Sequence, residues 1–196
     1  MNSVSITAAI LAGGAAQRLG GRDKGLQLLR GKPLIAWVCD RISAQVRTTV
    51  ICANRNVGIY TAYAAVVRDA TADFHGPMAG IVSAYQTLKD DWLLTVPVDC
   101  ATPPDDLAQR LYQACIDSSS AAAFVHDGQR QQPLFALYRR DLNLSAQTAL
   151  AQNDGVWRWQ ESSNAIAVDF SDQTHAFVNL NTPQDFLDFE ANRHER

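Results

Sequence analysis

Short apolar runs alternate along this chain with stretches that suit amphipathic helices, and this alternation restricts the possible fold more than any other feature. Four runs have the length and two-sided apolarity of strands buried in a parallel sheet: 6–11, 49–53, 92–98 and 121–125. Candidate crossover helices begin at or shortly after a proline: 33–44, 79–88 and 104–115. The pattern predicts an α/β fold, a Rossmann-like three-layer sandwich in which helices cover both faces of a mostly parallel sheet.

The second half of the chain is less regular, but its last helix has a clear start signal. Residues 133–138 suit a strand and residues 141–151 suit a helix. The start signal combines a threonine cap, a proline at the first helical position and an acid three residues after the cap, in Thr182-Pro183-Gln184-Asp185. We expect this helix to pack three apolar side chains onto the body of the protein: Phe186, Leu187 and Phe189.

No repeat, low-complexity linker or shift in composition divides the chain, so we expect residues 1–196 to form a single domain. A length of 196 residues with 47% hydrophobic side chains is enough for one substantial core. The net charge of -3 argues against the basic surface of proteins that follow long nucleic acids. We therefore expect no nucleic-acid partner, whereas a small anionic substrate remains compatible.

The cysteines and the apolar residues near the start of the chain indicate in which cellular compartment the protein works. The four cysteines lack Cys-x-x-Cys spacing and stand in apolar or helical stretches, which predicts buried, reduced thiols at Cys39, Cys52, Cys100 and Cys115. The apolar residues 4–12 follow no basic segment and are too few to span a bilayer. We expect a soluble, cytoplasmic protein with no membrane partner.

The most informative stretch is a glycine-rich loop, residues 11–25, that directly follows the first predicted strand. Glycines let backbone N–H groups approach phosphate oxygens without an intervening side chain, and they stand here at Gly13, Gly14, Gly20 and Gly21. Arg18 and Lys24 add charged donors. The loop therefore suits an anion, although the residues alone also allow a flexible surface loop with two solvated cations.

Two better-known phosphate loops do not fit this stretch. Lys24 is preceded by Asp23, and Lys32 is preceded by Gly31 but followed by Pro33, so neither lysine completes G-x-x-x-x-G-K-[ST]. The sequence also contains no G-x-G-x-x-G. A mononucleotide kinase and a nicotinamide enzyme are both disfavoured.

The chain resembles instead the nucleotidyltransferases of the molybdenum cofactor, whose opening has the form L-A-G-G-x-x-x-R-M-G-x-x-K-x-L. This chain reads L-A-G-G-A-A-Q-R-L-G-G-R-D-K-G-L, in which Leu19 replaces the methionine and Gly21 gives the G-G-x-D-K-G-L form typical of the guanylyltransferase branch. The resemblance continues in order through G-K-P-L at 31–34, A-N-R at 53–55, D-F-H-G-P-M-A-G at 73–80, P-V-D at 97–99 and N-L-N-T-P at 179–183. It implies a fold of the nucleotide-diphospho-sugar transferase type.

The resemblance implies a magnesium-dependent enzyme that transfers GMP from GTP to the phosphate of Mo-molybdopterin and releases pyrophosphate. Molybdenum-insertion proteins and molybdoenzyme chaperones are further possible partners. Asp99 follows the predicted strand 92–98, so its carboxylate should lie at the carboxyl end of a buried strand, where a hard oxygen ligand suits Mg²⁺. We assign Asp99 to the metal, and Lys24 and Arg18 to the triphosphate, as the three catalytic residues.

The resemblance also implies a nucleotide site formed largely by backbone. It places guanine against the turn Leu11, Ala12 and Gly13, with Gly14 adding a backbone contact to the phosphates. Asp69, which ends another short apolar run, occupies the position of a nucleotide-contacting aspartate. From the residues alone, Asp69 could equally be a solvated turn acid.

Several further contacts follow from the same resemblance. Cys52 aligns with a nucleotide-contacting asparagine of relatives, and Asn54, on the same face of the strand, could supply that contact instead. Gly80 belongs to a tight turn into a helix whose N-terminus offers free N–H groups to an anion. Asn179 and Asn181 should face the site near the pterin phosphate, although alone they would be interpreted as turn residues.

Four alternatives stay open at this point. The sister enzyme transfers CMP to the same pterin, but its opening resembles L-A-A-G-x-S-x-R-M-G, and Gly13 here favours guanine. Another small nucleotidyltransferase would share the loop and Asp99 but lack the N-L-N-T-P end. A cofactor carrier or a GTP-sensing adaptor would keep the loop without needing Asp99, which could then only cap the helix near residue 104.

Overall fold

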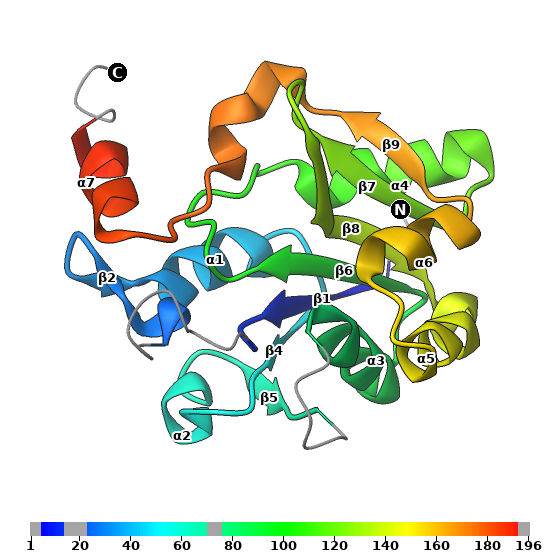
Figure 1. Ribbon diagram of the computed structural model, residues 1–196, viewed down its shortest axis with the longest axis horizontal. Helices are drawn as coiled ribbons and strands as arrows, with labels where there is room; N and C mark the ends of the chain where they lie inside the picture. The colour runs from blue at the N-terminus through cyan, green and yellow to red at the C-terminus, as the bar shows by residue number, and fades with distance from the viewer. Residues whose placement is uncertain (1–4, 14–22, 70–75, 192–196) are drawn as a thin grey trace.

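The computed structural model describes residues 5–13, 23–69 and 76–191, and a seven-stranded sheet runs through its middle (Figure 1). The strand order is β5-β4-β1-β6-β8-β7-β9. The strands are β1 Ile6–Leu11, β4 Thr48–Cys52, β5 Ala65–Val67, β6 Trp92–Pro97, β7 Ala122–His126, β8 Gln131–Arg139 and β9 Ile166–Asp169. β8 is antiparallel to its neighbours β6 and β7, while the pairs β1–β4, β1–β6, β4–β5 and β7–β9 are parallel.

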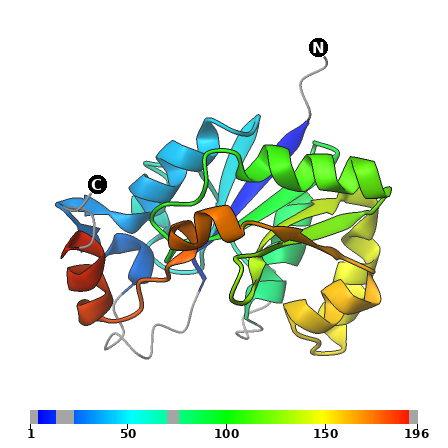
Figure 2. The ribbon, with the colours of Figure 1, turned by 90° about the horizontal axis from the view of Figure 1, so that it is seen from above.

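Helices cover both faces of this sheet and make the three predicted layers (Figure 2). The helices are α1 Leu34–Ser43, α2 Val57–Tyr60, α3 Pro77–Thr87, α4 Leu107–Ser118, α5 Asn143–Ala151, α6 Val156–Ser162 and α7 Pro183–Ala191. α1 and α4 bury side chains in one core cluster, and α3, α5 and α6 bury theirs in a second cluster on the opposite face. Shorter elements are η2 Lys24–Leu26, η3 Arg140–Leu142, η4 Ser171–Phe177 and the hairpin of β2 Leu28–Leu29 with β3 Lys32–Pro33.

The central strand β1 shows why the sheet is covered on both faces. Ile6, Ala8 and Ile10 belong to the core cluster under α1 and α4, whereas Ala9 belongs to the cluster under α3. Successive side chains of a strand point to opposite faces, so a strand that is apolar at every position needs a helical layer on each side. The continuous apolar runs of the sequence therefore predicted the layers correctly.

The four predicted parallel strands are present, and their ends lie within one residue of the predicted ends. The helix boundaries needed more correction. Pro33 is not the first helical residue but the N-cap of α1, because it stays extended and pairs with Leu28 in the hairpin. α3 begins at Pro77, two residues early, and α4 begins at Leu107, three residues late, after a turn that follows the proline pair.

The prediction for the last helix was correct for two of its three apolar side chains. Phe186 and Phe189 of α7 pack against a small cluster that contains Leu29, Leu34 and Leu180. Leu187 is 60% exposed, so its predicted packing was wrong. Residues three apart share a face of a helix while the next residue turns away by about 100°, and α7 buries only one such face.

Some elements had no sequence prediction. They include α2, α6, β5, β9 and the β2–β3 hairpin, which are too short or too irregular to show a helical or strand period. The predicted thiols are confirmed, since all four cysteines are free and buried. Among the helices of the described ranges, none combines the length and apolarity needed to cross a membrane.

A buried carboxylate joins the amino ends of three strands. Asp90 precedes β6, is 1% exposed and accepts hydrogen bonds from Thr7 Oγ1 at 2.7 Å, from Ser5 and from Arg47. Burial alone would raise the pKa of Asp90, but the hydrogen bonds from Arg47, Ser5 and Thr7 outweigh it and hold the pKa below its ordinary value. The ionised form of Asp90 therefore stabilises the fold.

We expect Asp90→Asn to lower the free energy of unfolding by roughly 3 kcal/mol at neutral pH, because it leaves donors of Ser5, Thr7 and Arg47 imperfectly paired. A depressed folded-state pKa contributes stability above the unfolded pKa and loses it as the pH falls through the folded pKa. We therefore expect the free energy of unfolding, measured by urea denaturation between pH 7 and pH 3, to fall more steeply with pH in the wild type than in the variant. If the free energy of unfolding falls with pH by the same amount in the wild type and in Asp90→Asn, this role of Asp90 is wrong.

Candidate active site

Three predicted site residues, far apart in the sequence, meet at the carboxyl end of the central strands. Lys24 is the first residue of η2, and its Nζ lies 3.2 Å from Oδ2 of Asp99 and also donates to Oδ1 of Asn181. The side chains of Lys24 and Asp99 are 28% and 19% exposed. β1 and β6 are parallel neighbours, so the loops that follow them must leave the sheet side by side. The arrangement gives a cation, a carboxylate and an amide at one open edge.

The segment that carries Asn181 is fixed from both sides. The N–H of Leu180 donates to the carbonyl oxygen of Asp99 at 2.8 Å, and Leu180 itself is fully buried. The carboxylate of Asp185 accepts from the N–H groups of Asn181 and Thr182, each at 2.7 Å, and the N–H of Asp185 donates to the hydroxyl of Thr182 at 3.2 Å. This confirms the predicted capping box and shows that it also holds a site residue.

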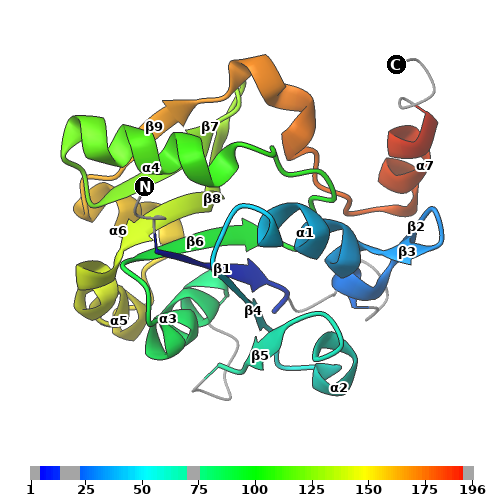
Figure 3. The ribbon, with the colours of Figure 1, turned by 180° about the vertical axis from the view of Figure 1, so that it is seen from behind.

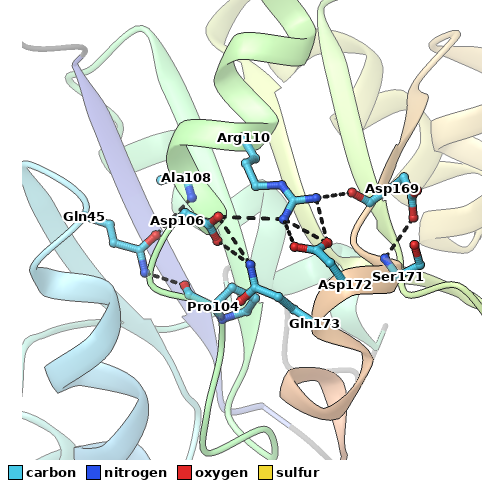
Figure 4. Close-up of polar contacts among 9 residues, drawn as sticks. All are labelled: Gln45, Pro104, Asp106, Ala108, Arg110, Asp169, Ser171, Asp172 and Gln173. Atoms are coloured by element: carbon cyan, nitrogen blue, oxygen red, sulfur yellow. Dashed lines mark hydrogen bonds and ion pairs between the residues drawn. The ribbon is translucent and has the colours of Figure 1, made fainter.

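The segment before Asn179 is joined to the start of α4 by a charged cluster (Figure 4). The Arg110 guanidinium pairs with Asp172 at 3.0 Å, lies 3.7 Å from Asp106 and stacks 3.8 Å above the ring of Phe170. Gln173 donates to Asp106 at 3.0 Å in the same cluster. A guanidinium makes several directed bonds at once, so this cluster fixes η4 against α4. It therefore holds the start of the segment that leads to the two asparagines.

Asp69 lies two residues beyond β5 and is held by Asn54. The Asn54 side chain donates to Oδ2 of Asp69 at 2.7 Å and accepts from the N–H of Asp69 at 2.9 Å. Both ends of the Asn54 amide are thus engaged by one residue. In the structure Asn54 orients the predicted nucleotide-contacting aspartate.

The thiol of Cys52 points into the protein core. Cys52 is 2% exposed, its Sγ donates to the carbonyl oxygen of Gly80 at 3.3 Å, and burial raises its pKa to about 12. A side chain at Gly80 would lie 3.1 Å from Leu11 Cδ2, so this glycine permits the close packing of α3 on β1 and β4. The N–H of Ala12 donates to the carbonyl oxygen of Cys52 at 2.9 Å, which fixes the turn that ends at Gly13.

Two predicted site residues, Gly14 and Arg18, lie outside the described residues. Asn179 is described, and its buried Oδ1 has no hydrogen-bond partner within the described part of the chain. Within those same ranges there is no group of three or more histidine, cysteine or acidic side chains arranged to hold a metal. The side chains of the described residues therefore do not by themselves form a complete set of metal ligands at this edge.

The residues that hold Asp23, at the end of the glycine-rich loop, were not predicted from the sequence. Asp23 accepts from the hydroxyl of Tyr60 at 2.5 Å, from Nδ2 of Asn56 at 2.9 Å and from the N–H of Gly25 at 3.1 Å. The position of Asp23 beside Lys24 was a usable signal. Tyr60 and Asn56 gave none, because their role depends on how the short helix α2 lies against the loop.

The fold and the site define the class of protein. A Leu-Ala-Gly turn after the central strand, and a lysine and an aspartate together at the carboxyl edge, are the parts expected of an α/β nucleotidyltransferase. Molybdopterin-guanine dinucleotide biosynthesis protein A from Archaeoglobus fulgidus has a similar fold, with a TM-score of 0.79 over 97% of this chain and 100% of that chain at 22% identity. A nucleotidyl transferase from Methanothermobacter has a TM-score of 0.75 over 97% and 98% at 18% identity.

The sequence comparisons give the particular family. The MobA-like NTP transferase domain matches residues 8–167. The chain is 42% identical over 181 residues to a molybdenum cofactor guanylyltransferase of Photobacterium profundum, covering 92% of this chain and 93% of that protein. It is 39% identical to one of Shewanella piezotolerans, over 93% and 90%. The chain belongs to the molybdenum cofactor guanylyltransferase family.

We expect Asp185→Ala to lower the free energy of unfolding by about 1 kcal/mol, because α7 loses the acceptor of its capping box. The backbone bonds from Asn181 and Thr182 lower the pKa of Asp185, so this contribution is present at neutral pH and lost as the pH falls through that pKa. Urea denaturation and hydrogen exchange at Leu180 provide the measurements. Asp188→Ala, an exposed change in the same helix, is the matched control. Equal effects of the two variants would contradict this role of Asp185.

Proposed function

We propose that this chain transfers GMP from GTP to the terminal phosphate of Mo-molybdopterin and releases pyrophosphate. The observation that carries the proposal is the meeting of Lys24, Asp99 and Asn181 at the carboxyl edge of the sheet. The relatives near 40% identity over more than nine tenths of the chain are named for guanylyl transfer to the molybdenum cofactor. Both observations point to the same reaction.

The reaction needs positioning and charge neutralisation, and no covalent enzyme intermediate. An oxygen of the pterin phosphate attacks the α-phosphorus of GTP, a new P–O bond forms, and the bond from the α-phosphorus to the bridging oxygen breaks as pyrophosphate leaves. We assign Lys24 and Arg18 to the triphosphate, where they offset the charge that develops on the leaving pyrophosphate. Leu11, Ala12, Gly13 and Gly14 would contact the nucleotide through backbone groups, and Asp69 through its carboxylate.

We also propose that the reaction uses Mg²⁺ held by Asp99. One partly exposed carboxylate at the end of β6 is a suitable donor, since Mg²⁺ in proteins is often held by one or two carboxylates together with substrate phosphates and waters. The bound ion would supply Lewis-acid stabilisation of the phosphate oxygens. Lys24 now occupies one oxygen of Asp99, so it would turn toward the phosphates as they enter.

Asn179 and Asn181 are the proposed contacts to the pterin phosphate end of the acceptor. Asn181 is held by Asp185 and lies against Lys24, which supports a role for it beside the proposed triphosphate site. The unpartnered Oδ1 of Asn179 can accept a hydrogen bond from a substrate donor. Gly80 lies in the first turn of α3, and we propose that the N–H groups of this turn contact the anionic end of the substrate.

Transfer of CMP is the second candidate, and it is disfavoured. The Leu-Ala-Gly-Gly opening and the names of the relatives both support guanine. The proposed contact from the residue at position 52 is not supported by the geometry of Cys52, whose thiol lies against α3. We therefore assign base recognition to the backbone of the turn and to Asp69, with Asn54 orienting Asp69.

We further propose that residues 1–196 act as one domain in the cytoplasm. One continuous sheet links β1 to β9, and Lys24 and Asn181, from opposite halves of the chain, lie together at one of its edges. Four free, buried thiols are suited to a reducing compartment.

We expect GTP with magnesium to raise the melting temperature more than CTP or ATP with magnesium at equal concentration. A ligand that binds only the folded protein stabilises it by RT ln(1 + [L]/Kd), so a tenfold difference in Kd at saturating ligand corresponds to about 1.4 kcal/mol. Thermal-shift titrations measure this directly. An equal or larger shift with CTP would favour cytidylyl transfer.

We expect Asp99→Asn to fold with nearly wild-type stability, since it exchanges one partly exposed ion pair for an amide of the same size. Transfer of GMP should fall by roughly two orders of magnitude or more, because a positioned charge at the reacting phosphates is lost. The magnesium concentration for half-maximal residual activity should rise. Initial rates of pyrophosphate release across a magnesium series, with Asp105→Asn as the exposed control, provide the test. Unchanged turnover and metal dependence would remove Asp99 from the site.

A further inference from the structure

The carboxylate of Asp23 is surrounded by donors from two different segments. Oδ1 accepts from the hydroxyl of Tyr60 and the N–H of Gly25, and Oδ2 accepts from the side chain of Asn56. With three donors on two oxygens, this carboxylate has little capacity left to bind a metal or a substrate. Asp23 is therefore suited to fix the backbone next to Lys24.

The hydroxyl of Tyr60 stays protonated and so remains a hydrogen-bond donor to Asp23. Tyr60 is fully buried, and burial together with the hydrogen bond to Asp23 raises the pKa of its hydroxyl well above the ordinary value. It stays protonated throughout the physiological range. The contact therefore persists at any pH at which the enzyme would work.

Packing around Gly25 connects this contact to the other side of the site. A side chain at Gly25 would overlap the Tyr60 hydroxyl and lie 2.9 Å from Cγ2 of Val98, so only glycine fits. Gly25 directly follows Lys24, and Val98 directly precedes Asp99. The backbone beside the cation is thus packed between the side chain of Tyr60 and the side chain of Val98, the residue before the carboxylate.

The same short segment also orients the second carboxylate of the site. Asn54 holds Asp69 through two hydrogen bonds, while Asn56 and Tyr60 hold Asp23. Residues 54–60, which follow β4 and include α2, therefore contact both the predicted nucleotide aspartate and the residue before Lys24. α2 lies beside β5 at the edge of the sheet in two opposite views (Figures 1 and 3).

We propose that the contact of Tyr60 and Asn56 with Asp23 is a positioning device for Lys24, which we name the Asp23 clamp. The clamp sets where the ammonium of Lys24 lies relative to Asp99, and hence relative to the phosphates; this part rests on the proposed function. Tyr60, Asn56 and Asp23 touch no reacting atom and act through Lys24. A residue with a merely structural role would change stability and leave the site geometry unaltered.

The first experiment needs no substrate and therefore does not depend on the proposed function. The sequence has three lysines, Lys24, Lys32 and Lys89, so amine labelling followed by mass spectrometry resolves each one. Tyr60→Phe removes only the hydroxyl of the clamp. We expect the labelling rate of Lys24, relative to Lys32 and Lys89 in the same molecules, to rise at least about threefold.

The matched control is Tyr63→Phe, which removes a hydroxyl three residues away from a side chain that is 37% exposed. This control should leave all three rates unchanged. A general loosening of the fold would raise the rates of Lys32 and Lys89 as well. If the relative rate of Lys24 in Tyr60→Phe equals that of the wild type, the clamp does not hold Lys24 and the proposal is wrong.

The second experiment measures the effect on turnover. We expect Tyr60→Phe to lower kcat for GMP transfer about tenfold and to change the KM for GTP by less, since small displacements of a positioned group mainly cost rate. Asp23→Asn keeps an acceptor for Gly25 and Tyr60, and Asn56 can turn its amide to match it. It should therefore retain more kcat than Asp23→Ala, which removes every acceptor.

The outcomes of the two experiments are distinguishable. Faster labelling of Lys24 with unchanged kcat would overturn the positioning role while leaving the contact itself in place. Equal losses in Asp23→Asn and Asp23→Ala would show that hydrogen bonding is not what matters, and would also overturn it. A wild-type protein that transfers no GMP would contradict the proposed function, and the labelling of Lys24 would still decide whether the clamp holds the lysine.

Discussion

The parallel pairing of β1 with β4 and β6 is the constraint on which the rest of the structure depends. These three strands are apolar on both faces, so they are stable only when helices cover each side. Their parallel direction sends every following loop out at one edge. Ala12 and Gly13 after β1, the segment after β4 and Asp99 after β6 must therefore gather at that edge, whatever each loop contains.

The edge is held together by contacts that cross long stretches of sequence. Lys24 contacts Asp99 and Asn181, and the N–H of Leu180 donates to the carbonyl oxygen of Asp99. Arg30 joins the β2–β3 hairpin to α7, since its N–H and its guanidinium both donate to Glu190. An ion pair as exposed as Lys24 with Asp99 contributes about 1 kcal/mol or less to stability. This ion pair matters because it positions two charged groups at the site. Most of the stability comes from the two core clusters.

Two kinds of acid can be separated by their partners. Asp90 and Asp23 each accept three hydrogen bonds from protein donors, and such carboxylates fix strands and loops. Asp99 keeps a partly exposed carboxylate whose partner, Lys24, can move with its flexible side chain. The same residue type thus serves as scaffold where its bonds are all internal, and as a binding group where one bond can be exchanged for a ligand.

The sequence by itself determined the layers, the four parallel strands and the cap of α7. The spacing of apolar residues and the capping motif each depend on residues that are close together in the sequence. The sequence also determined the family, through motifs in order along the chain. Tertiary structure alone decided that Cys52 turns its thiol to Gly80, that Asn54 is engaged with Asp69, and that Tyr60 reaches Asp23. These depend on the close approach of segments distant in sequence, and side-chain contacts between such segments have no periodic signal that a single sequence can carry.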